Sequence, residues 1–155
     1  MHSKISVRSV FISDIHLGAP FCRITPLIRC LQNIDPEMVY LVGDIFDGWR
    51  IARKRPKWNS PCIWFVQRVL QWISQGVPVT YITGNHDEFL RHYTGFSVPG
   101  FRLLDEDVYE TASGERYLVT HGDFFDKSIK YDVLTHLGSA SYETLFRLLW
   151  YPQLS

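Results

Sequence analysis

The chain has 155 residues, of which 46% are hydrophobic and 21% are charged. This composition is ordinary for a folded globular domain and excludes a disordered or collagen-like chain. Sixteen basic and sixteen acidic side chains cancel, so no overall charge draws the molecule to nucleic acid or to an anionic membrane. The length predicts one domain with a single core, and any attraction to an anion must be local.

The N-terminal end of the chain predicts no export signal. Residues 1–8 are polar, and the longest apolar runs have the length of a strand rather than of a membrane helix. Cys22, Cys30 and Cys62 are odd in number and show no C-x-x-C spacing, which favours reduced thiols over a disulfide framework or a zinc site. We therefore expect a cytoplasmic protein.

Four short apolar runs, rich in β-branched and aromatic residues, predict buried strands over residues 7–13, 38–42, 77–83 and 116–120. Apolar residues with helical spacing lie between the first three runs and predict helices over residues 24–34 and 60–76. Ser60 is the expected N-cap of the second helix, with Pro61 at its first position and Gly76 at its end. This alternation predicts βαβ units around a parallel sheet.

The pattern changes after Gly84. Residues 102–110 and 116–120 flank the turn-forming residues 112–115, which predicts a β-hairpin. Residues 131–150 have a helical pattern that becomes very apolar at its end, only a few residues before Ser155. This ending indicates the N-terminal portion of a longer domain.

Polar side chains follow each of the four predicted strands directly. Because open α/β sheets build their sites at the carboxyl ends of strands, we expect these side chains to meet at one rim. They are Asp14 and His16 after the first strand, Asp44 and Asp47 after the second, Asn85, His86 and Asp87 after the third, and His121 and Asp123 after the fourth.

Carboxylate oxygen and neutral imidazole are ligands that suit Mn²⁺, Fe and Zn²⁺, and a bridging carboxylate can hold two ions. A single Asp or His at a strand end is usually a turn or capping residue. The ordered set D-x-H, G-D-x-x-D and G-N-H-D is hard to obtain by chance and favours a metal centre. Gly43 and Gly84 precede these ligands, where the strand must turn without a Cβ clash.

These ordered blocks resemble the calcineurin-like metallophosphoesterase superfamily, and the resemblance extends from Asp14 to His121. It implies an α/β fold in which a β-sandwich is flanked by helices (αββα), and two divalent metal ions, Mn²⁺ first, with Fe and Zn²⁺ as alternatives. By resemblance, Asp14 and His16 bind one ion, Asp44 bridges both, and Asn85 and His121 bind the other.

The same resemblance assigns His86 to donate to the phosphate or to protonate the leaving oxygen. It gives Asp87 the role of orienting His86, and Asp47 that of supporting the site. The family normally supplies a further G-H-x-H block downstream, which this sequence lacks. We therefore expect residues 1–155 to be a single metallophosphoesterase domain of which only the N-terminal portion is present.

Within the superfamily, the stretches VGDIFDGWR and THGDFFD are most similar to the UDP-2,3-diacylglucosamine hydrolase-like branch. That branch cleaves the pyrophosphate of a nucleotide-linked lipid precursor at the cytoplasmic face of the membrane. The resemblance thus implies a phosphorylated small-molecule or lipid-linked substrate and peripheral membrane contact. Its well-defined lipid enzymes tend to carry Arg where this chain has His86, so a nucleotide phosphodiesterase, a phosphoprotein phosphatase and a non-catalytic scaffold remain as alternatives.

A basic stretch over residues 49–58 directly follows the second ligand block, with a tryptophan near each end. Such a loop fits a diphosphate or an anionic membrane surface, and less well a nucleic-acid backbone. The plain alternative is a solvated loop. The substrate-binding candidates in it are Arg50, Arg53 and Arg55.

Overall fold

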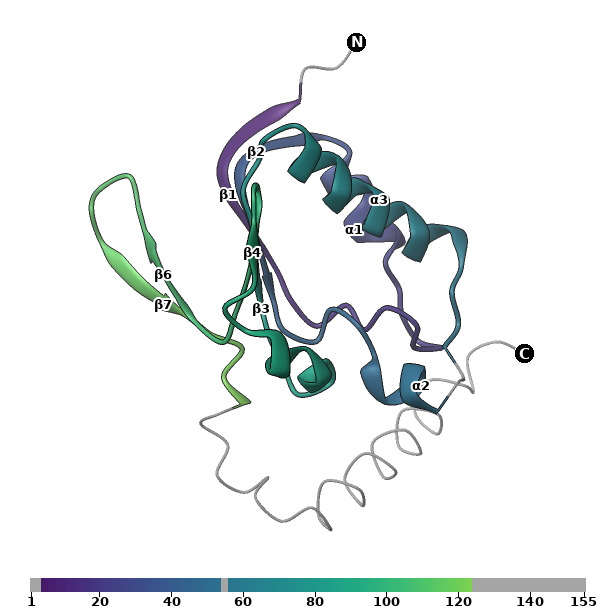
Figure 1. The fold of residues 1–155 in the computed structure, drawn as a ribbon. Helices are drawn as coiled ribbons and strands as arrows, with labels where there is room; N and C mark the ends of the chain where they lie inside the picture. Colours follow the sequence, from purple (N-terminus) through teal and green to yellow (C-terminus); the bar gives the residue numbers. More distant parts are fainter. Residues whose placement is uncertain (1–3, 54–55, 124–155) are drawn as a thin grey trace. The chain divides into compact units, whose positions relative to one another are not determined.

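The structure is a computed structural model that describes residues 4–53 and 56–123 (Figure 1). The chain divides into two units, Met1–His121 and Gly122–Ser155, and the elements below all belong to the first. Arg55 and the predicted helix over residues 131–150 lie outside the described residues.

A five-stranded sheet forms the centre of the first unit. Neighbouring strands follow the order β1-β2-β3-β5-β4, and all pairs are parallel except the short edge pair β4–β5. The predicted parallel sheet is therefore confirmed. Its strands are β1 (Ile5–Ile12), β2 (Ile34–Val42), β3 (Val79–Ile82), β4 (Ser97–Val98) and β5 (Phe101–Leu104).

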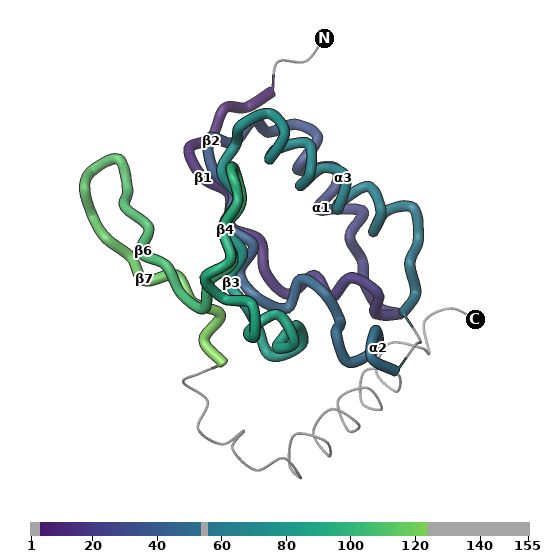
Figure 2. Tube along the Cα trace, viewed as in Figure 1, coloured from purple at the N-terminus to yellow at the C-terminus, as the bar shows by residue number. Residues whose placement is uncertain are grey.

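Two predicted helices, α1 (Thr25–Leu31) and α3 (Ser60–Ser74), cover one face of this sheet (Figures 1 and 2). The N-cap of α3 is Asn59 rather than Ser60, because the Asn59 side chain accepts a hydrogen bond from the backbone N–H of Cys62 at 3.1 Å. Helix α1 ends before the predicted Ile34, since β2 begins at that residue.

The pleat of β2 sends alternate side chains to opposite faces of the sheet. Val39 and Leu41 are buried in the helix-side core, together with Phe65 and Trp72 of α3. Tyr40 is buried on the other face, in a smaller apolar cluster. The helix-side core thus contains Trp72, which belongs to the apolar stripe of α3.

The predicted hairpin is confirmed as a separate two-stranded sheet of β6 (Asp107–Glu110) and β7 (Arg116–Val119). It lies on the side of the large sheet opposite the helices (Figure 1). Tyr109 joins it to β1, where its hydroxyl accepts a hydrogen bond from Ser9 Oγ at 2.7 Å. The strand predicted over residues 102–110 is in fact two strands, β5 of the large sheet and β6 of the hairpin.

Two short helical elements follow the strand ends directly: α2 (Gly48–Ala52) after β2, and the 3-10 helix η1 (Glu88–Tyr93) after β3. Neither is predicted from the sequence. Among the residues that the structure describes, no helix has the length and apolar character needed to cross a membrane. Cys22, Cys30 and Cys62 are free thiols, as expected.

Candidate metal centre

The loops after β1 and β2 run beside each other at the carboxyl edge of the sheet. The backbone N–H of Asp14 donates to the carbonyl of Gly43 at 3.2 Å, and that of His16 donates to the carbonyl of Asp44 at 2.9 Å. These bonds continue the pairing of the two parallel strands past their ends. As a result, Asp14 and His16 lie beside Asp44.

Three of the predicted ligands have a strained backbone. Asp14, His16 and Asp44 have φ values of 56°, 48° and 54°, and they are the non-glycine residues with positive φ among those the structure describes. Each such conformation costs about 1–3 kcal/mol and persists only where surrounding structure enforces it. Strain confined to the predicted ligands indicates that this edge of the sheet is shaped for a purpose other than stability.

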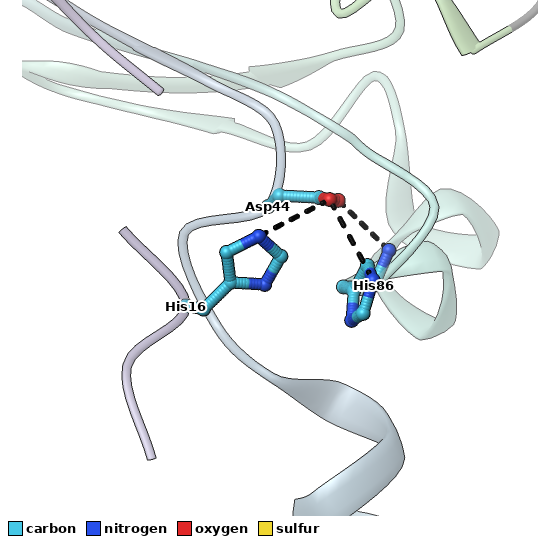
Figure 3. A group of neighbouring side chains, drawn as sticks. All are labelled: His16, Asp44 and His86. Atoms are coloured by element: carbon cyan, nitrogen blue, oxygen red, sulfur yellow. Dashed lines mark hydrogen bonds and ion pairs between the residues drawn. The ribbon is translucent and has the colours of Figure 1, made fainter. Parts of the chain in front are cut away.

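Candidate metal ligands form two groups that share Asp44. One group is His16, Asp44 and His86, and the other is Asp14, Asp44 and His121; in each group the ligand atoms lie within 4.8 Å of one another. Figure 3 shows the first group, in which His16 and His86 both approach the Asp44 carboxylate. Asp44 therefore occupies the position that a bridging ligand requires.

The distances within the groups leave room for ions rather than for direct hydrogen bonds. Asp44 Oδ2 lies 3.7 Å from His16 Nε2, 4.0 Å from His86 Nε2 and 3.9 Å from His121 Nε2. Asp14 Oδ1 lies 3.5 Å from His121 Nε2. These separations are longer than ordinary hydrogen bonds and are compatible with a metal ion between the atoms.

The electrostatics of the site favour a bound cation. Burial raises the pKa of Asp44, although the backbone N–H of His86 opposes this by donating to Asp44 Oδ1 at 2.8 Å. Burial and the neighbouring His86 lower the pKa of His16, which favours the neutral imidazole that binds metals. Since the ion-pair partners of Asp44 among the described residues are all imidazoles, a buried carboxylate here gains most from a metal cation.

The grouping differs in part from the sequence prediction. Asp14 and His16 were expected on the same ion, but Asp14 groups with His121, and His16 groups with His86. The resemblance predicts His86 as a proton donor, but its imidazole also lies close enough to His16 and Asp44 to be a metal ligand. Asn85 is half-buried in the same loop, directly before His86.

The structure places Asp87 and Asp47 differently from their predicted roles. The fully buried Asp87 carboxylate accepts hydrogen bonds from the backbone of Gly84 at 2.6 Å and Ile45 at 2.9 Å, and from Tyr81 Oη at 2.6 Å. It thereby ties the loop after β3 to the loop after β2. The carboxylate beside the His86 ring is that of Asp47, whose Oδ1 lies 3.8 Å from His86 Nδ1.

Two glycines are required by the close approach of these loops. A Cβ on Gly84 would lie 2.4 Å from Asp44 Oδ1, and a Cβ on Gly43 would lie 2.3 Å from the ring of His121. Gly43 also has a φ of +66°, which a side chain would strain. From the sequence, these glycines are expected because the chain turns sharply. The structure shows a second reason, since the side chains of Asp44 and His121 occupy the space that a Cβ would need.

His121 reaches the site from the hairpin and not from the parallel sheet. The sequence predicts that the side chains after all four strands meet at one rim, and among the described strands β7 pairs with β6 alone. The three loops that follow the parallel strands therefore supply four members of the two groups (Asp14, His16, Asp44 and His86), and the end of the hairpin supplies His121. The packing of His121 against Gly43 brings the two sources together.

The first residues of the basic stretch form part of α2, which contains Arg50. Asp47 caps this helix by accepting from the backbone N–H of Arg50 at 3.1 Å, and the Arg50 side chain lies 3.5 Å from the same carboxylate. Burial raises the pKa of Asp47, but His86 and Arg50 outweigh it, so that the net shift is downward. Arg53 ends the helix and is exposed.

Curated relatives of this chain are enzymes named UDP-2,3-diacylglucosamine hydrolase. The protein of Actinobacillus succinogenes is 35% identical over 121 residues, covering 75% of this chain and 49% of the relative. The proteins of Stenotrophomonas maltophilia and Vibrio vulnificus are 35% and 31% identical, with 74% of this chain covered in each case. The chain spans about half the length of these relatives, which is 46% and 47% for the latter two.

The sequence of residues 7–153 also matches the family model of the calcineurin-like phosphoesterases. This match includes both candidate metal groups, the parallel sheet and the hairpin. The chain belongs to the calcineurin-like phosphoesterase family.

Proposed function

We propose that the protein is a metal-dependent hydrolase of phosphoester or pyrophosphate bonds. The observation that carries this proposal is the sharing of one buried carboxylate, Asp44, by two groups of candidate ligands. A lone metal site needs no such arrangement, whereas a two-metal site needs a bridge. The family of the chain supports the same chemistry.

In this proposal each residue of the site has a defined task. Asp44 bridges the two ions, His16 binds one, and Asp14, Asn85 and His121 bind the other. Such ions, when bound, lower the pKa of a bridging water and clamp the phosphoryl oxygens. Mn²⁺ is the ion we expect, because the donor set mixes carboxylate oxygen with imidazole nitrogen; Fe and Zn²⁺ suit the same donors.

His86 is proposed to hold the proton that the leaving oxygen receives. Its Nε2 faces the site from the Asp44 side, and its Nδ1 faces Asp47. Asp87 is proposed to act indirectly, because its carboxylate binds the backbone N–H groups of Ile45 and Gly84 and so fixes the loops that carry the ligands. Asp47 takes the orienting role beside the His86 ring.

For the substrate, we propose a nucleotide-linked lipid precursor similar to UDP-2,3-diacylglucosamine, met at the inner face of the cytoplasmic membrane. The names of the relatives support this, and so does the position of Arg50 on α2 and of Arg53 at the C-cap of this helix, close after Asp47. Arg55 of the same basic stretch is proposed as a further substrate-binding residue. A nucleotide phosphodiesterase is the second candidate, favoured by His86, because the resemblance described under Sequence analysis implies Arg at this position in the lipid enzymes.

The first test is metal-stimulated hydrolysis of bis-p-nitrophenyl phosphate with Mn²⁺. Asp44→Asn should lower kcat by at least about 10³-fold, because the bridge for both ions is lost. Asp35→Asn is the matched control, since Asp35 is exposed at the opposite end of the same strand and should leave the rate unchanged. Near-normal activity of Asp44→Asn, or a protein without metal and without turnover, would sink the proposal in favour of a scaffold.

The second test concerns the substrate. The rate with UDP-2,3-diacylglucosamine is compared with the rates for simple nucleotides and for a phosphopeptide under the same metal conditions. The lipid proposal predicts a kcat/KM that is highest for the lipid substrate. Equal or better rates with nucleotides would rule the lipid out while leaving the metal-dependent hydrolase intact.

A further inference from the structure

The imidazole of His86 lies between two aromatic rings. The ring of Trp49 lies against it with centroids 3.9 Å apart and an interplanar angle of 33°, and the ring of His16 meets it edge-on at 4.5 Å and 86°. The Trp49 contact is a tilted one, and its centroids lie closer together than the roughly 4.5–7 Å typical of aromatic pairs. Of the two ring contacts that His86 makes with described residues, it is the shorter.

The nitrogen atoms of His86 are held less firmly than its face. The distances from Nδ1 to Asp47 and from Nε2 to Asp44 are 3.8 Å and 4.0 Å, both too long for a hydrogen bond. The Asp47 carboxylate can attract Nδ1 by its charge, but contacts of this length do not by themselves fix the plane of the ring. Among the direct side-chain contacts of the described residues, the one with Trp49 lies closest to the face of the imidazole and can hold its plane.

The first turn of α2 is built to place Trp49 there. The Gly48 backbone N–H donates to the His86 carbonyl at 2.9 Å, and a Cβ on Gly48 would lie 2.4 Å from that same oxygen. Only glycine permits this approach. The Asp47 cap fixes the start of the turn, so the next side chain along, Trp49, lies over the His86 ring.

We propose that Trp49 is a positioning residue for His86, which keeps the imidazole turned toward the two-metal site while the proton is transferred to the leaving oxygen. This inference rests on the proposed function. It extends that function by assigning a task to the tryptophan of the D-G-W sequence, which the ligand motifs leave without one. A misplaced imidazole slows the chemical step without weakening the binding of substrate or metal.

The kinetic test compares three variants with the wild-type chain. Trp49→Leu, which keeps apolar bulk but loses the ring, should lower kcat for bis-p-nitrophenyl phosphate by about 10- to 100-fold, with KM and Mn²⁺ affinity changed less than twofold. Trp49→Phe keeps a ring face and should recover most of kcat. Phe96→Leu is the control, because Phe96 is a 54% exposed aromatic residue outside the ligand loops and the basic stretch, and it should behave as wild type.

A readout that needs no turnover separates this inference from the proposed function. In histidine side-chain NMR spectra, assigned with His86→Gln, the carbon-bound ring protons of His86 should be shifted upfield by Trp49 and lose that shift in Trp49→Leu. If the wild-type chain shows the shift but no hydrolysis, the proposed function fails and the stacking stands. An unchanged His86 signal in Trp49→Leu, or a loss of KM rather than kcat, would overturn the positioning role.

Discussion

The core beneath α1 and α3 consists of apolar side chains, and it includes Phe65 and Trp72, which are both almost completely inaccessible. At the carboxyl ends of the same strands, the buried positions hold Asp44, Asp47 and Asp87. The two regions belong to one sheet, but burial of side chains has opposite effects on the free energy of folding in them. Apolar burial stabilises the fold by about 25 cal/mol per Å², whereas burial of an unpaired carboxylate opposes folding.

The backbone repeats this contrast. The carboxyl edge contains three residues with unfavourable positive φ and three glycines without room for a Cβ (Gly43, Gly48 and Gly84), whereas the helix-side core rests on regular strands and helices. Strain of this kind is stored at functional sites and offset elsewhere in the fold. We therefore expect changes in the core to act on stability, and changes in the loops to act on metal binding and rate.

The largest effect on stability is expected from the core. Trp72→Ala removes a fully buried ring and should lower the free energy of unfolding by about 3–5 kcal/mol, measured by urea denaturation. Mn²⁺ affinity per folded molecule should remain unchanged. A loss of metal affinity with unchanged stability would show that the two regions are not distinct in the way described here.

Gly43→Ala should affect both properties. The added Cβ meets the ring of His121, and the residue would keep a φ of +66°, so we expect a loss of about 2–4 kcal/mol in stability together with weaker Mn²⁺ binding. Gly114→Ala is the matched control, since its φ is +85° but nothing lies within 4 Å of an added Cβ. It should cost only about 1–2 kcal/mol and leave metal binding intact. Equal effects of the two variants would contradict the crowding.

Tyr81→Phe tests the buried Asp87 link between the two loops. Burial and the adjacent Asp87 raise the pKa of Tyr81, so its hydroxyl remains a donor, and its removal deprives the carboxylate of one of three hydrogen bonds. Stability should fall by about 1.5–3 kcal/mol. The peptide N–H groups of Ile45 and Gly84 should also exchange with solvent faster, and unchanged exchange there would argue against the link.

The smallest effect concerns pH in the metal-free protein. Burial and His86 lower the pKa of His16 below the model-compound value of 6.5, so the unfolded chain takes up a proton at this residue before the folded protein does. Stability should therefore fall as the pH drops below about 6.5, with a contribution of at most about 1.4 kcal/mol per pH unit. In His16→Gln this part of the decline should disappear; an identical pH profile would contradict it.

The sequence carries local information well, and most of the sheet follows from it. Runs such as residues 38–42 predict their strand because β-branched and aromatic residues fit a buried sheet, and the polar blocks that follow mark the candidate ligands. Contacts between loops carry no such signal. The sequence assigns Asp87 to the side of His86, whereas the structure has Asp47 beside the His86 ring and Asp87 bonded to the Ile45 backbone. This difference depends on how the loops after β2 and β3 pack on each other, which residue spacing does not encode.

The same reason accounts for the missed helix α2. Its five residues are too few to show a helical period, and it is held by the Asp47 cap and by the bond from Gly48 to the His86 carbonyl. The stacking of Trp49 on His86 follows from that helix. One signal could have suggested it, namely Asp-Gly before a tryptophan, where the aspartate reads as a cap.

The most direct test of the shared carboxylate is the number and coupling of Mn²⁺ ions in the protein, measured by equilibrium dialysis and electron paramagnetic resonance. The account predicts two ions per chain that are magnetically coupled, and a loss of that coupling in Asp44→Asn. It would be contradicted by a wild-type chain that binds no ions or one, or by an Asp44→Asn variant whose two ions remain coupled as before.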